Sequence, residues 1–129
     1  MKAILDAVAQ HARQRPQAVA LQGEQQILSY AMLDATVDHL ADHLRQLKPR
    51  ALGLLMDNGP AWVVADLAAA RANVPVVPLP AFFTAMQLQH TLDDAGVELI
   101  WTDQPQRLAT IDGPCETQAI EIAGSSVTV

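Results

Sequence analysis

Two histidines, His39 and His43, stand four residues apart, a spacing that on a helix can bring two imidazoles to one metal ion. A metalloprotease helix of this type also carries a glutamate directly after its first histidine, as the general base. In this chain that position is Leu40. The histidines are therefore expected on a hydrated helix face, and no metal site is predicted.

Asp57 follows a run of apolar residues at 51–56 in an acidic chain, where a response-regulator receiver domain would carry its phosphorylated aspartate. A receiver also needs an acidic pair after its first strand and a lysine after its last strand, to hold Mg²⁺ and phosphate. The only lysines are Lys2 and Lys48, and Asp6 has no acidic neighbour. We expect Asp57 to begin a turn or helix, with a receiver as a distant alternative.

The sequence also indicates neither a glycine-rich phosphate-binding loop nor the nucleophilic serine of a hydrolase. The six glycines are scattered and form neither GxGxxG nor GxxxxGK[ST]. The segment 123–127, with Gly124 before two serines, lacks the second glycine of a nucleophile elbow.

Phe82 and Phe83 follow Pro78-Leu79-Pro80, directly after an apolar segment of strand length. Open α/β sheets place ligands in loops beyond the carboxyl ends of their strands. Packing is the expected role of the pair, and a ligand site is the alternative.

The elements that must position these residues alternate between helix and strand. A stripe of apolar residues at intervals of three and four predicts a long helix that Ser29 caps and Pro49 ends: Tyr30, Leu33, Val37, Leu40, Leu44 and Leu47. Further helices are predicted at 4–14, 61–73 and 84–95, with Asn58 as a cap for the second of these, Thr84 as a cap for the third and Gly96 ending it. Strands are predicted at 18–22 and 26–29, as a hairpin, and at 51–56, 74–79 and 97–101.

Strands without polar alternation, separated by helices, predict an α/β fold with a mostly parallel sheet covered on both faces, in three layers. A length of 129 residues predicts a single domain. Beyond Asp103 the pattern fades, and only 119–122 and 126–129 resemble strands, so residues 104–129 carry the least defined part of the prediction.

Composition excludes several classes of function. Fourteen acidic side chains against eight basic ones leave a net charge of −6, so binding to nucleic acid or to an anionic membrane surface is not expected. The most apolar window, 60–83, contains Asp66, Arg71 and internal prolines, so it is not expected to span a membrane. A single cysteine, Cys115, and no signal-peptide pattern favour the cytoplasm.

Several segments together resemble the amino-terminal region of adenylate-forming enzymes, which include acyl-CoA synthetases, luciferases and the adenylation domains of nonribosomal peptide synthetases. The resemblance rests on four stretches and runs from about Ile4 to Asp103: Leu28-Ser29-Tyr30-Ala31-Met32-Leu33-Asp34, then Leu55-Met56-Asp57-Asn58-Gly59-Pro60-Ala61-Trp62, then 70–80 (ARANVPVVPLP), then 92–103 (LDDAGVELIWTD).

The resemblance implies a reaction and its cofactors. Such enzymes activate a carboxylic acid with ATP, using Mg²⁺, and pass the acyl group to the thiol of coenzyme A or of a carrier protein. The family's Ser/Thr/Gly-rich phosphate loop ending in Pro-Lys-Gly has no counterpart in these 129 residues. ATP, Mg²⁺ and coenzyme A are therefore implied for a parent enzyme, and no catalytic residue, metal or cofactor is assigned to this chain.

One site is implied by a more distant likeness. In acetyl-CoA synthetases, the loop that matches Pro80, Ala81, Phe82 and Phe83 helps to hold coenzyme A and contains a glycine pair. Here that pair is Ala81-Phe82. The loop is therefore expected to offer a hydrophobic wall for an acyl or pantetheine chain instead of a close backbone contact.

Two hypotheses follow. In the first, the chain is the amino-terminal structural portion of an AMP-forming acid:thiol ligase, a fragment that is inactive alone and packs against the rest of the synthetase. In the second, it is a free-standing docking or split-enzyme module that binds a separately encoded partner. The apolar helix at 61–73 is expected to leave a hydrophobic face exposed, which would allow a homodimer.

Overall fold

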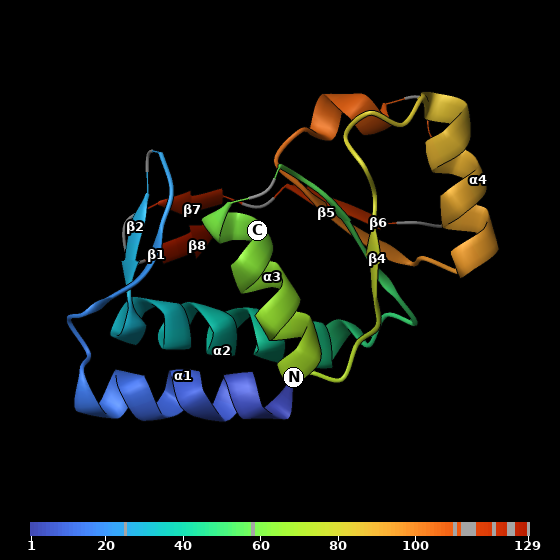
Figure 1. Ribbon diagram of the computed structural model, residues 1–129. Coiled ribbons are helices and arrows are strands. Elements are labelled where there is room, and N and C mark those ends of the chain that lie inside the picture. Colours follow the sequence, from blue (N-terminus) through green and yellow to red (C-terminus); the bar gives the residue numbers. More distant parts are fainter. Residues whose placement is uncertain are drawn as a thin grey trace.

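Helices and strands alternate along the chain around one main sheet in the computed structural model (Figure 1). The structure describes residues 1–24, 26–57, 59–109, 111, 116–119, 121–123 and 126–128. The helical elements are α1 (Lys2–Gln14), α2 (Tyr30–Leu47), α3 (Pro60–Arg71), α4 (Ala85–Ala95) and the 3-10 turn η1 (Pro105–Leu108). The strands are β1 (Val19–Gln22), β2 (Ile27–Ser29), β3 (Leu52–Leu55), β4 (Val76–Pro78), β5 (Leu99–Thr102), β6 (Glu116–Ala119), β7 (Glu121–Ala123) and β8 (Ser126–Thr128).

The main sheet has four parallel strands in the order β4–β3–β5–β6. From β3 the chain passes through α3 to β4, and then through α4 to β5 on the other side of β3. The helices α3 and α4 cover opposite faces of this sheet (Figure 1). The three-layer α/β fold with a mostly parallel sheet is therefore confirmed. The winding reverses between β3 and β5, and open α/β sheets bind ligands near the strand ends at such a point.

The face that carries α2 and α3 holds the larger of two hydrophobic clusters. Four residues of the predicted stripe on α2 are buried: Leu33, Val37, Leu40 and Leu44. They pack with residues of β3 and β5 that point to the same side, among them Leu54 and Trp101. The Ser29 hydroxyl accepts the hydrogen bond of the Met32 amide at 3.1 Å, so the predicted cap is confirmed. Helix α1 packs along α2 on the side away from the sheet (Figure 1).

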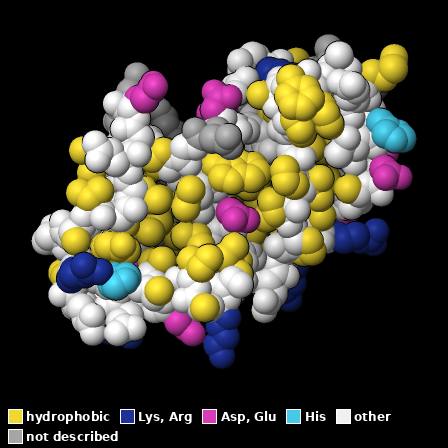
Figure 2. Space-filling view, viewed as in Figure 1, with side chains coloured by type: hydrophobic (Ala, Val, Ile, Leu, Met, Phe, Trp, Pro, Cys, Tyr) yellow, Lys and Arg dark blue, Asp and Glu magenta, His cyan; other side chains and the backbone are white. Residues whose placement is uncertain are grey.

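Helix α3 differs from the expectation that its apolar surface would be exposed. Every residue of α3 is buried or half-buried, because the helix packs beside α2 against the sheet and also contacts α1. The hydrophobic side chains visible over this part of the molecule in Figure 2 thus belong to a half-buried surface.

In the described part of the chain, no helix is long and apolar enough to cross a membrane.

The opposite face carries α4 and a smaller cluster. Leu88 and Leu92 of α4 pack against Leu55 and Ile100 of the sheet. Thr84 and Gln87 form a reciprocal capping box at the start of α4, and Gly96 ends it with φ of 67°, in the left-handed region that glycine tolerates. Both predicted ends of this helix are confirmed.

The chain beyond Asp103 follows its prediction in part: β8 lies within the predicted strand 126–129, whereas the predicted strand 119–122 is divided between β6 and β7. Strand β6 joins the main sheet parallel to β5 and begins three residues earlier than the first strand expected there. Strands β7 and β8 pair antiparallel as a separate hairpin, and β1 and β2 form the predicted amino-terminal hairpin. Asn58, predicted as a cap, and Cys115 lie outside the described residues, and the cap position of α3 is Gly59.

Candidate functional site

The segment between β4 and α4 leaves the sheet at the carboxyl end of β4 and is fixed at both ends. Leu79 is buried, and its amide donates to the Leu54 carbonyl at 2.9 Å, which continues the sheet pairing for one residue. The Phe83 amide donates to the Pro80 carbonyl at 3.1 Å and closes a tight turn. Thr84 then caps α4. The Pro80–Phe83 loop is therefore an ordered turn between two anchored elements.

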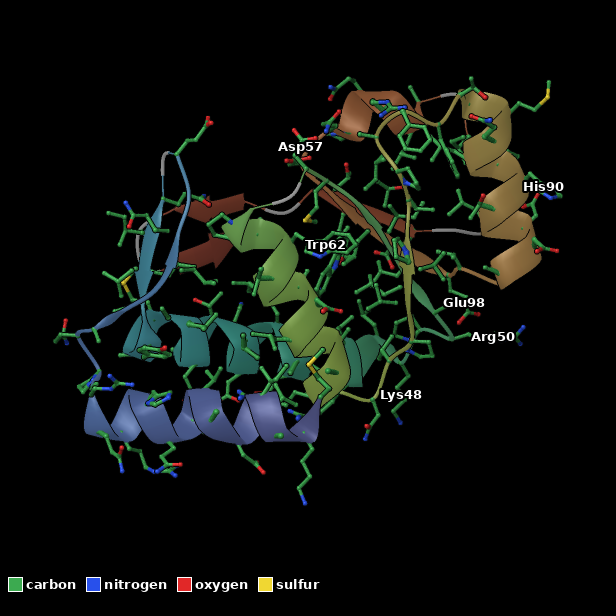
Figure 3. All side chains as sticks on the ribbon, viewed as in Figure 1. Lys48, Arg50, Asp57, Trp62, His90 and Glu98 are labelled. Carbon is green, nitrogen blue, oxygen red and sulfur yellow. The ribbon has the colours of Figure 1, made fainter. Side chains whose placement is uncertain are left out.

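A pocket of about 340 Å³ lies beside this loop. Its lining comes from the ends of β3 and β4, the start of α3 and the loop itself: Met56, Asp57, Trp62, Pro78, Leu79, Pro80, Ala81 and Phe82. Figure 3 shows Asp57 beyond the carboxyl end of β3 and Trp62 at the side of α3. The structure thus brings together three of the four residues predicted for the site.

The two phenylalanines of the loop have different surroundings. Phe82 is 82% exposed at the pocket, whereas Phe83 is half-buried against the cluster under α4 and does not line the pocket. Their rings meet edge to face, with centroids 5.4 Å apart. Phe83 therefore anchors the loop, and Phe82 is the aromatic side chain available to a ligand.

Sequence reasoning did not place Met56, Trp62 or Arg107 at the site. Met56 and Trp62 belong to a strand end and a helix start that the fold brings to the loop. Arg107 lies in η1. Its Nη1 donates a hydrogen bond to the Ala81 carbonyl, and its Nη2 donates one to the Phe83 carbonyl at 2.6 Å. Because its partners are backbone carbonyls, no pattern of side-chain types could have revealed it.

The lining determines what the pocket can bind. Met56, Trp62, Leu79 and Phe82 provide apolar walls, and Asp57 provides one exposed carboxylate at the edge. Asp57 makes no hydrogen bond or ion pair with another described residue. Across the described part of the chain, His, Cys, Asp and Glu side chains nowhere gather in the groups of three or more that a metal site requires. The pocket is suited to holding an apolar chain, and its described residues do not include a paired nucleophile and base.

A second hollow, of about 590 Å³, lies where α1, α2 and the end of α3 meet. Three of its charged groups pair with one another, since Arg71 lies 2.5 Å from Asp38 and 3.3 Å from Asp34. The hollow lies away from the carboxyl ends of the parallel strands. We therefore assign the candidate site to the smaller pocket, because it lies at the strand ends where α/β sheets bind ligands.

The two histidines are not brought together on one ligand. His39 is exposed, as expected. His43 is half-buried, contrary to the expectation of a hydrated face, and its Nε2 lies 3.1 Å from Gln118 Oε1. The indole N–H of Trp101 donates to the same oxygen at 2.9 Å, so His43 Nε2 acts as a donor too. His43 therefore fastens β6 to α2.

A family model described as AMP-binding enzyme matches residues 8–128. The chain belongs to the AMP-binding enzyme family. The resemblance to adenylate-forming enzymes found in the sequence is thereby confirmed, over a longer span than the quoted segments covered.

Similar proteins agree with this family assignment. Phosphinothricin tripeptide synthetase PhsC of Streptomyces viridochromogenes is 28% identical over 134 residues, which cover 87% of this chain and 12% of PhsC. The NpsA N-terminal subdomain of Klebsiella oxytoca has the same fold, with a TM-score of 0.74 and 18% identity over 90% of this chain and 30% of that one. O-succinylbenzoate coenzyme A synthetase (MenE) of Bacillus subtilis, solved in complex with AMP, has a TM-score of 0.68 and 23% identity over 87% of this chain and 30% of that one.

Proposed function

We propose that this chain forms the amino-terminal α/β part of an AMP-forming acid:thiol ligase. The match of residues 8–128 to the AMP-binding enzyme family carries this proposal. The similar proteins are considerably longer than the matched region, since the chain spans 12% of PhsC and 30% of the MenE chain. The remaining part of such an enzyme would supply the ATP and Mg²⁺ sites.

The proposed reaction has two steps. A carboxylate oxygen of the substrate attacks the α-phosphorus of ATP, pyrophosphate leaves, and an acyl-adenylate forms. A thiol then loses its proton and attacks the acyl carbon, a thioester forms, and AMP leaves. The thiol belongs to coenzyme A or to a carrier protein.

Within this enzyme, we assign the pocket at the carboxyl ends of β3 and β4 to an acyl or pantetheine chain. Pro80, Ala81 and Phe82 form one wall, with Met56 and Trp62 opposite, and Phe83 holds the loop from behind. A volume of about 340 Å³ falls at the lower end of the range for small-molecule sites, which suits a narrow chain better than a nucleotide base and sugar together.

Carboxylate-dependent exchange between ATP and pyrophosphate tests the reaction. We expect no exchange with the 129-residue chain alone, and exchange with the product of the whole natural reading frame that contains it. If that frame adds no further enzyme segment, proteins that co-purify with the chain are assayed in the same way. Restored exchange with a co-purified protein would indicate the split-enzyme alternative, and exchange by the chain alone would contradict the proposed inactivity.

Coenzyme A binding tests the pocket through tryptophan emission, to which Trp62 in the lining and the buried Trp101 both contribute. We expect a titratable change in emission with a dissociation constant below about 1 mM, lost in Phe82→Ala. Met86→Ala is the matched control, because Met86 is also 82% exposed but does not line the pocket. Equal loss in both variants, or no binding by the unaltered chain, would remove the pocket from the proposal.

A further inference from the structure

The guanidinium of Arg107 bridges two carbonyls of one loop, those of Ala81 and Phe83. The described part of the chain places no carboxylate within ion-pair distance of Arg107, unlike Arg45 and Arg71. Its charge is therefore directed at backbone dipoles. Hydrogen bonds from a charged donor are stronger than those between neutral groups, so two of them on one short loop constrain it strongly.

Arg107 is itself held in place by the end of β5. The Thr102 hydroxyl accepts the hydrogen bond of the Gln104 amide at 2.8 Å and shapes the turn into η1. Leu108, next to Arg107, is buried in the cluster under α4. The loop after β4 is thus tied to the segment after β5, although these strands lie on opposite sides of β3.

The two bonds determine where Phe82 points. The carbonyls of Ala81 and Phe83 flank Phe82 in sequence, and both are directed at Arg107. The phenyl ring of Phe82 is left on the pocket side at 82% exposure, although an aromatic ring gains free energy by burial. The Arg107 bonds lie on the residues either side of the ring and so restrict the backbone from which it projects.

We propose that Arg107 is a positioning residue for the pocket, which fixes the Pro80–Phe83 loop so that Phe82 forms its wall. Arg107 does not line the pocket itself, so it acts through the loop. The ligand-binding consequence rests on the proposed function, whereas the effect on the loop does not.

Hydrogen exchange at the backbone amides of 81–84 tests this role directly. In Arg107→Gln we expect exchange to rise by about tenfold or more at the Phe83 and Thr84 amides, which donate to the Pro80 carbonyl and to Gln87 Oε1, with the β5 amides unchanged. Arg107→Lys keeps the charge but lacks the guanidinium fork, so it should give a smaller increase. Arg45→Gln is the matched control, since Arg45 donates to the Arg71 carbonyl far from the loop, and it should leave 81–84 unchanged.

Coenzyme A titration of the same variants, read by tryptophan emission, separates the two proposals. Faster loop exchange together with weaker binding in Arg107→Gln supports both. Faster loop exchange when no form of the chain binds coenzyme A supports the positioning role and removes the ligand assignment. Unchanged exchange at 81–84 in folded Arg107→Gln overturns the positioning role, whatever the titration gives. If Arg107→Gln does not fold, unchanged exchange in Arg107→Lys does so instead.

Discussion

The two faces of the main sheet are built in different ways. Under α2 and α3, the described residues include a cluster of sixteen buried side chains, further covered by α1. Under α4, the corresponding cluster has eight. The pocket opens at the strand ends, where the Pro80–Phe83 loop begins on the side of the smaller cluster.

The smaller face depends more on polar contacts with the backbone. Arg107 holds two loop carbonyls, Thr84 caps α4, and Thr102 shapes the turn before η1. On the larger face, the elements are held in place mainly by apolar packing along α2. The comparison indicates that the larger face supplies stability, while the smaller face keeps a loop in one defined conformation beside a pocket.

Truncating one leucine on each face should give the largest effects. Leu40 on α2 and Leu92 on α4 are both almost fully buried. We expect Leu40→Ala to lower the free energy of unfolding by about 2 to 5 kcal/mol. Leu92→Ala should fall at the lower end of that range. The cluster around Leu92 is smaller, so α4 can shift to fill the cavity that the substitution leaves. Urea denaturation monitored by the buried Trp101 measures both changes. An equal or larger loss in Leu92→Ala would contradict the comparison.

The larger face is also the part of the fold that the sequence predicts best. The stripe on α2 reflects burial of one side of the helix, and the continuous apolar runs of β3 and β5 reflect burial on both faces of the sheet. Strand β6 was missed because Glu116, Thr117 and Gln118 are polar, and the first two are exposed, so the strand carries no apolar pattern. It is recognised only through its pairing with β5.

The candidate site was predictable only in part. The position of Phe82 after a strand, together with the family resemblance, was enough to select the loop. Trp62 and Met56 join it through the tertiary arrangement of α3 and β3. The loop is also bound by Arg107, whose partners are backbone carbonyls and so cannot be recognised from side-chain types in the sequence.

A methyl group at Gly53 tests how tightly the smaller face packs. A Cβ there would lie 3.0 Å from Leu79 Cδ1 and 3.2 Å from Val97 Cγ1, both in the cluster under α4. We expect Gly53→Ala to destabilise the chain by about 1 to 3 kcal/mol and to displace Leu79, at the entry to the loop. Thermal unfolding measures the first effect and amide exchange at 79–83 the second.

Gly59→Ala is the control for that change. A Cβ at Gly59 meets no described atom within 4 Å, and the backbone there is extended, with φ of 168°. We expect Gly59→Ala to lower the free energy of unfolding by only about 0.5 kcal/mol, because alanine is a poorer N-cap residue than glycine. If Gly53→Ala lowered the free energy of unfolding no more than Gly59→Ala, the smaller cluster would contain space for the added methyl group. The order of the loop could then not depend on packing from Leu79.

Removing one helix cap on each face should give the smallest effects and the sharpest contrast. Ser29→Ala on α2 and Thr84→Ala on α4 each delete one hydroxyl acceptor, and each is expected to cost about 0.5 to 2 kcal/mol. Their local consequences should differ. Helix α2 remains held by its buried stripe, so Ser29→Ala should leave amide exchange in the loop unchanged. Thr84 directly follows the loop, so its loss should raise exchange at 81–87.

Thr84→Ser retains the hydroxyl and should behave as the unaltered chain, which separates loss of the cap from loss of the methyl group. Raised exchange confined to 81–87 in Thr84→Ala would place the cap beside Arg107 as a second constraint on the loop. If Ser29→Ala loosened the loop as much, the two faces would respond as one cooperative unit, and the difference between them would concern burial alone.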